Sequence, residues 1–114
     1  SIMDRRKDMV ISGGVNIYPR EVEEALLRHV SVAEAAVVGL PDPKWGERLA
    51  AIIVLAPKAI LREEEIVAHC REFLGGYKVP RFVRFVDELP RNPAGKVMKR
   101  TIRDGLSATA AHLE

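Results

Sequence analysis

The spacing of hydrophobic and polar positions along the chain predicts three helices. Apolar residues recur at helical intervals over residues 19–29, where acidic residues occupy the first turns and suit the helix dipole. A second helix is predicted over residues 62–74, because its apolar positions share one face, and the glycines at 75–76 are expected to end it as a C-cap. A short third helix is predicted from Lys99 to residue 106, and residues 107–114 are expected to fray.

Shorter apolar runs predict strands between these helices. Residues 9–18 are typical of a β-hairpin, since the adjacent glycines at 13 and 14 tolerate the positive φ angles that a tight hairpin turn requires. Strands are also predicted over residues 34–40 and 81–86. The run at residues 49–55 is almost continuously apolar, which is typical of a central strand buried on both faces.

Proline and glycine predict loops at residues 41–47 and 89–95. The resulting element order predicts an α+β fold, in which helices pack on a small three-stranded sheet and an N-terminal two-stranded hairpin projects from one end.

Composition narrows the functional classes. A chain of 114 residues with 47% hydrophobic residues has room for one packed domain. No apolar run approaches the length that a membrane helix needs, and the first residues show no apolar signal-peptide core. The single cysteine fits a reducing compartment, so we expect a cytoplasmic protein without a membrane span. One Cys and three scattered His offer no zinc spacing, and we expect no metal site.

Positive charge is concentrated in the C-terminal third. Residues 76–104 carry eight Lys/Arg against three Asp/Glu, whereas residues 31–75 carry five against seven. Such a stretch is either a solvated face or the binding surface of a phosphate-rich partner, which includes nucleotides and nucleic acids.

Two segments carry candidate chemistry. Residues 4–18 are a polar stretch that leads into the glycine hairpin, and residues 89–100 present Lys96 on a loop stiffened by proline and glycine. A lysine ammonium on such a loop can reach into another domain and neutralise charge that develops on a phosphate or carboxylate.

Together these segments resemble one family. Residues 4–23 are similar to the motif Asp-Arg-x-Lys-Asp followed by Gly-Gly-x-Asn-Ile-x-Pro-x-Glu-Val-Glu, and residues 90–96 are similar to Pro-(Lys/Arg)-x-x-x-Gly-Lys. The block Val37-Gly39-Leu40-Pro41-Asp42 with Gly46-Glu47 matches the segment between them. The chain therefore resembles the C-terminal domain of the adenylate-forming (AMP-binding) superfamily, in its acyl-CoA synthetase branch.

The resemblance implies an ATP-dependent ligase that converts a carboxylate and ATP into an acyl-adenylate and pyrophosphate, then transfers the acyl group to CoA and releases AMP. Residues 1–106 would be its mobile C-terminal lid. Its partners would be the enzyme's own N-terminal domain, which binds ATP, the acid and Mg²⁺, together with a small carboxylic acid and CoA. We expect the medium- or long-chain fatty acid type, and we expect the isolated domain to be inactive and to bind no cofactor by itself.

The resemblance also implies roles for individual residues. Lys96 matches the adenylation lysine, which bridges the substrate carboxylate and the α-phosphate. Arg5 matches an arginine near the nucleotide, and Lys7 matches the hinge about which the lid turns.

A second group of residues would serve CoA. Gly13 and Gly14 match the hairpin tip that lines the pantetheine tunnel, although closing a tight turn is an equally good reason for them. Trp45 and Tyr77 lie where related enzymes place aromatic side chains against the CoA adenine, with ordinary packing as the alternative. Lys78 is a candidate contact to CoA phosphates, as is Arg81.

The residues by themselves are also compatible with two other classes of function. The basic C-terminal third suits a stand-alone module that binds phosphate or RNA, but aromatic residues make up only 5% of the chain and no RNA motif is present, so we expect no nucleic-acid partner. A protein-interaction domain is the other alternative.

Overall fold

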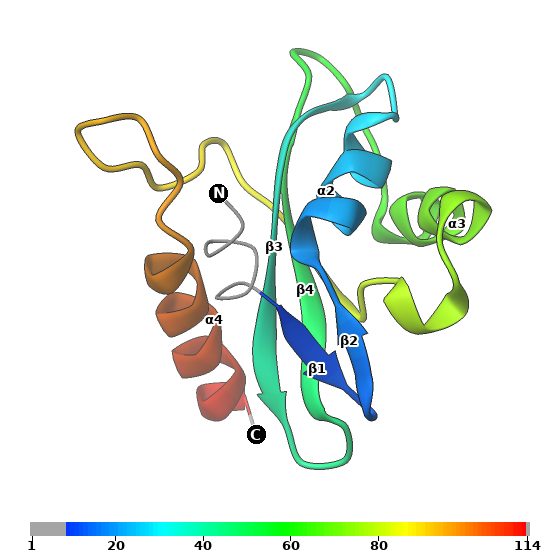
Figure 1. Ribbon diagram of the computed structural model, residues 1–114. Helices are drawn as coiled ribbons and strands as arrows, with labels where there is room; N and C mark the ends of the chain where they lie inside the picture. The colour runs from blue at the N-terminus through cyan, green and yellow to red at the C-terminus, as the bar shows by residue number, and fades with distance from the viewer. Residues whose placement is uncertain (1–8, 114) are drawn as a thin grey trace.

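The computed structural model describes residues 9–113 of the chain (Figure 1). The elements follow the predicted order: β1 (Val10–Ser12), β2 (Val15–Ile17), α2 (Pro19–Leu27), β3 (Val32–Asp42), β4 (Gly46–Leu55), α3 (Glu63–Phe73), the 3-10 helix η1 (Gly76–Lys78), β5 (Phe82–Phe85) and α4 (Lys99–Leu113). The predicted α+β architecture, with a three-stranded sheet and a separate hairpin, is confirmed.

The three-stranded sheet has the strand order β3–β4–β5 and is mixed. Strands β3 and β4 form a long antiparallel hairpin, while β5 runs parallel to β4. A parallel neighbour requires a crossover connection, and the segment that contains α3 supplies it. Strand β4 is therefore the central strand, as its apolar sequence predicts.

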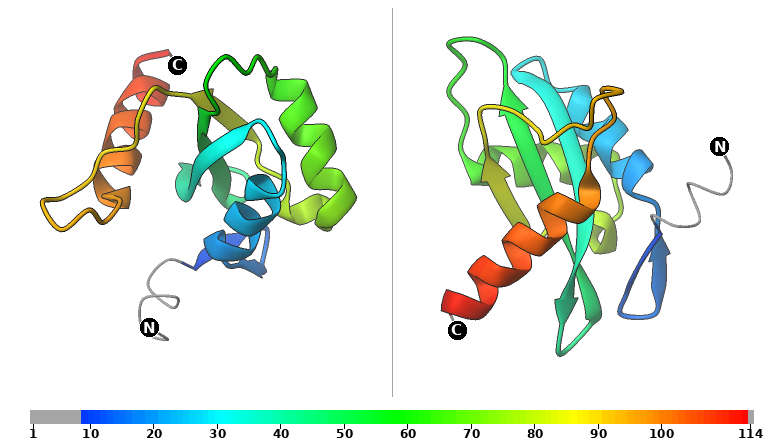
Figure 2. Two further views of the ribbon diagram at one scale, coloured as in Figure 1. Left: turned by 90° about the horizontal axis from the view of Figure 1, so that it is seen from above. Right: turned by 90° about the vertical axis from the view of Figure 1, so that its left-hand side faces the viewer.

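Helices cover both faces of this sheet, so the domain has three layers. Helix α4 lies on one face, and α2 and α3 lie on the other (Figure 2). Side chains along β4 alternate between the two cores: Leu49, Ala51 and Ile53 point towards α2 and α3, whereas Ala50 and Ile52 point towards α4. Burial on both faces explains why β4 contains no polar residue from position 49 to position 55.

The core beneath α3 includes Cys70, which is fully buried. Burial raises the pKa of the Cys70 thiol to about 11, because the thiolate is poorly solvated there. Cys70 is thus an inert packing residue.

The β1–β2 hairpin closes through two glycines. Gly13 has a φ of 57° and Gly14 a φ of 81°, and positive φ at both central residues is what a type I′ hairpin turn requires. Its inner side chains Val10 and Ile17 are buried in the core on the α2 and α3 side.

The connection between β3 and β4 is shorter than the loop predicted at residues 41–47. Only three residues separate the strands, because the Asp42 carboxylate accepts the backbone N–H groups of Lys44 and Trp45, both at 2.8 Å. Gly46 then takes a φ of 85° to start β4. The Asp42 carboxylate thus stabilises a short turn where the prolines and Gly46 predicted a longer loop.

Two helix ends also differ from the prediction. Leu74 has an extended conformation and Gly75 a negative φ, so the glycines do not form a left-handed C-cap; they lead into η1 instead. Helix α4 continues to Leu113, seven residues beyond the predicted end. No helix within residues 9–113 has the length and apolar character needed to cross a membrane.

Candidate functional site

The loop that carries Lys96 projects from the body of the domain. It leaves the sheet after β5, extends away from the layers and returns to start α4; it is drawn in orange in Figure 1. Lys96 is exposed, and its ammonium group makes no ion pair with any described residue. The predicted adenylation lysine therefore lies at an outward-facing tip.

Backbone hydrogen bonds fix the shape of this loop. The N–H of Asn92 donates to the carbonyl of Lys96 at 2.9 Å, and the Lys96 N–H donates to Oδ1 of Asn92 at the same distance. Gly95 makes the turn between them with a φ of 86°. Met98 N–H closes the base of the loop on the carbonyl of Pro90 at 2.8 Å. The backbone at Lys96 is thus held while its side chain is left to solvent.

Arg91 ties the loop to the sheet. One guanidinium nitrogen donates to the carbonyl of Gly95 at 2.7 Å, and another pairs with the carboxylate of Glu34 on β3. The rigid fork of a guanidinium can make both contacts at once. Arg91 therefore links the turn next to Lys96 to the edge of the sheet.

A second ion pair fixes the point where the loop enters α4. Nζ of Lys99 lies 2.8 Å from Oε2 of Glu23 on α2, and this oxygen also accepts the N–H of Val37 on β3 at 2.8 Å. Both side chains are mostly buried, at 21% and 18% exposure, so this pair is less screened by solvent than a surface ion pair.

The hairpin tip lies against Trp45 in the β3–β4 turn. The N–H of Gly13 donates to the carbonyl of Trp45 at 2.8 Å. A Cβ atom on Gly13 would come within 2.7 Å of Cε3 of the indole ring, whereas a Cβ on Gly14 would meet nothing within 4 Å. Gly13 is thus required for close contact with Trp45, and Gly14 faces open space.

The indole of Trp45 is half-buried between cations. Nζ of Lys44 lies 5.0 Å from a ring centroid of the indole, and Cζ of Arg81 lies 4.9 Å from it, both within range of a cation–π interaction. The N–H groups of Trp45 and Lys44, with Arg48 and Arg81 nearby, lower the pKa of the neighbouring Asp42 carboxyl. The aromatic ring that contacts Gly13 therefore has two cationic side chains close to it.

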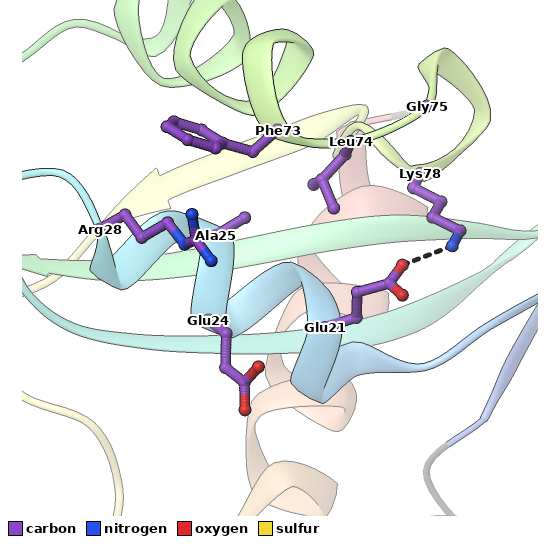
Figure 3. A pocket seen from close by; sticks show the side chains of 8 residues that line it. All are labelled: Glu21, Glu24, Ala25, Arg28, Phe73, Leu74, Gly75 and Lys78. Carbon is purple, nitrogen blue, oxygen red and sulfur yellow. Dashed lines mark hydrogen bonds and ion pairs between the residues drawn. The ribbon is translucent and has the colours of Figure 1, made fainter.

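Tyr77 and Lys78 lie on η1, at a different position. Tyr77 is 56% exposed, and no ring contact joins it to Trp45 within residues 9–113. Lys78 pairs with Glu21 of α2 and lines a groove of about 320 Å³ between α2 and α3 (Figure 3). The Glu21 carboxylate raises the pKa of Lys78, so this lysine is charged but already partnered.

The structure thus brings together some predicted residues and separates others. Gly13, Gly14 and Trp45 lie where the β1–β2 hairpin meets the β3–β4 turn. The loop between β5 and α4, which carries Lys96, lies well away from that hairpin in every view (Figures 1 and 2). Arg5 and Lys7 lie outside the described residues. Among residues 9–113, no group of three or more His, Cys, Asp or Glu could hold a metal ion.

Sequence reasoning missed the residues that support these two regions. Arg91 fills the Lys/Arg position of the motif at residues 90–96, but the motif implied no role for it, and its acidic partner Glu34 lies 57 positions away. Nothing local signals that contact. Asp42, in contrast, stands before a proline and a glycine, a pattern that could have predicted its bonds across the turn.

Comparison with known proteins shows the family. The model of the AMP-binding enzyme C-terminal domain matches residues 21–96, and the chain belongs to this family. The resemblance seen in the sequence is therefore confirmed, and the match is to an enzyme domain rather than to an RNA-binding module.

Similar proteins are considerably longer than this chain. Long-chain-fatty-acid–CoA ligase FadD13 of Mycobacterium tuberculosis is 49% identical over 108 residues, which is 95% of this chain and 21% of that protein. A 2-succinylbenzoate–CoA ligase of Bacillus cereus is 50% identical over 102 residues, 90% of this chain and 21% of the relative. The chain thus spans about one fifth of the length of the curated relatives it matches.

Solved structures agree with the fold. A fatty acyl CoA synthetase of Mycobacterium tuberculosis superposes with a TM-score of 0.84 at 48% identity, covering 90% of this chain and 20% of that one. The o-succinylbenzoate CoA synthetase MenE of Bacillus subtilis, solved with the acyl-adenylate intermediate OSB-AMP, gives a TM-score of 0.81 at 43% identity, covering 87% and 20%.

Proposed function

We propose that this chain is the C-terminal lid of an ATP-dependent acyl-CoA ligase. In the first half-reaction a carboxylate oxygen of the acid attacks the α-phosphorus of ATP and pyrophosphate leaves. In the second, the CoA thiolate attacks the acyl carbon of the adenylate and AMP leaves with the shared oxygen. The lid supplies one set of residues to each step.

The observation that carries the proposal is the exposed Lys96 on a rigid, outward-facing loop. Its backbone is fixed through Asn92 and Gly95, and its ammonium group has no partner among the described residues. An ammonium group placed beside the α-phosphate would stabilise the negative charge that develops as the carboxylate attacks. Such preorganised contacts are typically worth a few kcal/mol, or about 10²–10³ in rate.

The opposite end of the domain suits the CoA step. A narrow channel for the pantetheine arm needs walls without bulk, and Gly14 has no atom within 4 Å of its missing side chain. Trp45 offers a half-buried ring beside Arg81, a setting in which an adenine could stack and a phosphate could pair. Tyr77 is a further exposed ring for adenine.

Lys78 is proposed as a CoA-phosphate contact with one added condition. It is already paired with Glu21, so a CoA phosphate would have to replace that carboxylate or share the ammonium with it.

Arg5 is proposed to contact the nucleotide, and Lys7 to be the hinge between the two poses of the lid. Both proposals follow from the motif that these residues share with the family. A hinge works by changing φ and ψ at very few residues. Mg²⁺ is expected to bind the N-terminal domain together with ATP.

The acid is proposed to be a medium- or long-chain fatty acid. The relatives include a long-chain-fatty-acid–CoA ligase but also a 2-succinylbenzoate–CoA ligase. Measuring kcat/KM of the full-length enzyme for acids of both types would distinguish these two substrate classes.

An oxygen-18 experiment tests the reaction class. The full-length enzyme that carries this chain is incubated with ATP, CoA and a fatty acid labelled with ¹⁸O in its carboxylate. Transfer of one ¹⁸O atom into AMP is expected, because AMP leaves with the bridging oxygen of the acyl-adenylate. Thioester formation with unlabelled AMP, or with ADP as product, would contradict the proposal.

A further inference from the structure

The carboxylate of Glu47 on β4 binds the edge of the β1–β2 hairpin. Its Oε1 accepts the backbone N–H of Ile11 at 2.9 Å. Ile11 pairs with Asn16, one step from the pair that closes the two-residue turn. Alternate pairs in an antiparallel ladder direct their N–H groups outwards, so Glu47 satisfies a donor on the outer edge of β1.

The second oxygen of Glu47 lies over a glycine in the neighbouring strand. A Cβ atom on Gly39 of β3 would come within 2.6 Å of Oε2 of Glu47 and 2.9 Å of Cγ2 of Val10. The missing side chain at Gly39 thus makes room for both the carboxylate and the first residue of β1. The carboxylate of Glu47 on β4 therefore lies between residues of β1 and β3.

A second contact holds the same hairpin at its tip. The Gly13 N–H donates to the Trp45 carbonyl, two residues before Glu47. Besides the burial of Val10 and Ile17, the hairpin thus has one polar contact with β4 at the middle of β1 and another with the β3–β4 turn at its glycine tip. Without the Glu47 carboxylate, the edge N–H of Ile11 loses its acceptor, and only the polar contact at the tip remains.

We infer that Glu47 is a positioning residue for the thioester-forming step: it fixes the hairpin so that the glycine tip lines the path of the CoA thiol. This inference rests on the proposed function. Among residues 9–113, Glu47 makes no hydrogen bond or ion pair with the Lys96 loop or with the residues that anchor it. Its effect is therefore confined to the hairpin end of the domain and to the second half-reaction.

The test compares two substitutions in the full-length enzyme. Glu47→Ala removes the acceptor, whereas Glu47→Gln keeps an amide oxygen at the same position. Glu72→Ala, which removes an exposed carboxylate on α3, is the matched control. Adenylate formation is measured by ATP–pyrophosphate exchange, and thioester formation is measured from supplied acyl-adenylate with CoA and with pantetheine as alternative acceptors.

Glu47→Ala is expected to slow thioester formation about tenfold, roughly the effect of losing one charge-assisted hydrogen bond, and to leave adenylate formation within twofold of the wild type. The loss should be equal with CoA and pantetheine, because the hairpin acts on the arm that both acceptors share. Glu47→Gln should recover most of the rate.

Three results would overturn the inference: an unchanged thioester rate in Glu47→Ala, a loss seen with CoA but not with pantetheine, or a parallel loss of both half-reactions, which would mark Glu47 as a general stability residue. A wild-type enzyme that makes no thioester at all would instead refute the proposed function, so the two failures are distinguishable.

Discussion

The Lys96 loop and the β1–β2 hairpin are both fixed to the body of the domain, but by different kinds of contact. Both are tight turns that contain glycine with positive φ. The Lys96 loop is tied down by long charged side chains, Arg91 to Glu34 and Lys99 to Glu23. The hairpin is held through its own backbone, because the Gly13 N–H donates to the Trp45 carbonyl and the Ile11 N–H donates to the Glu47 carboxylate.

This difference matches the role proposed for each region. The loop presents a charge, so its anchors lie at its base and its tip stays exposed. The hairpin presents a surface without bulk, so close contact is achieved by leaving side chains out. The Lys96 loop and the hairpin tip lie at separate places on one domain. This arrangement fits a lid that uses the loop in adenylate formation and the hairpin tip in thioester formation.

The largest expected effect comes from removing the presented charge. In the full-length enzyme, Lys96→Ala should slow adenylate formation by about 10²–10³, because the developing charge loses its preorganised cation. ATP–pyrophosphate exchange measures this rate. Arg71→Ala, which removes an exposed cation on α3, should leave it unchanged. Thioester formation from supplied adenylate should survive in both variants, and equal loss of the two half-reactions in Lys96→Ala would contradict its role.

Adding bulk at the hairpin tip should have the opposite selectivity. Gly14→Leu should slow thioester formation by at least an order of magnitude, since a side chain would project into the space proposed for the CoA arm. Leucine at positive φ also costs roughly 1–2 kcal/mol of folding stability. Gly14→Asn is the matched control, because Asn tolerates the left-handed region better. If Asn and Leu lower stability and both half-reactions together, the glycine serves only the turn.

A smaller effect is expected at the anchor of the Lys96 loop. Arg91→Ala should slow adenylate formation about tenfold, because the carbonyl of Gly95 and the carboxylate of Glu34 both lose their donor. Arg91→Lys should fall between Ala and the wild type, since one ammonium cannot reproduce the two contacts of the guanidinium. The measurement is again pyrophosphate exchange. An equal loss of thioester formation would contradict a role of Arg91 that is specific to the Lys96 loop.

The smallest expected effect is a dependence of the β3–β4 turn on pH. The pKa of Asp42 lies below its ordinary value of 3.8 in the folded chain, mainly because its carboxylate accepts the N–H of Trp45. Its stabilising contribution is therefore complete above that ordinary pKa and is lost as the pH falls through the folded pKa. Thermal denaturation of wild type and Asp42→Asn should differ near neutral pH, and the difference should shrink as the pH falls through the lowered pKa of Asp42. A difference that persists unchanged in acid would contradict this cause.

The fold was largely predictable, because strong local patterns determine it. The apolar run of β4 identified the central strand, and paired glycines identified the hairpin. The turn at Asp42 is shorter than the loop that its prolines predict, because one carboxylate accepts two N–H groups there. The glycines after α3 were expected to be a cap, but the chain extends at Leu74 instead.

The candidate site was predictable only where a motif carries it. Lys96 and the glycine pair could be located from residue order alone. The hydrogen-bond partners of Glu34 and Glu47 could not, although Glu47 stands in a matching block, because these partners lie 57 and 36 positions away along the chain. Such contacts depend on how the sheet brings distant segments together, which no local pattern records.

A single-turnover quench experiment tests the division of labour between the two ends most directly. Wild type, Lys96→Ala and Gly14→Leu are mixed with radiolabelled acid, ATP and CoA, and the acyl-adenylate and acyl-CoA are resolved over time. We expect acyl-CoA from the wild type, neither product from Lys96→Ala, and accumulated acyl-adenylate from Gly14→Leu. Accumulated adenylate in Lys96→Ala, or neither species in Gly14→Leu, would contradict this division of labour.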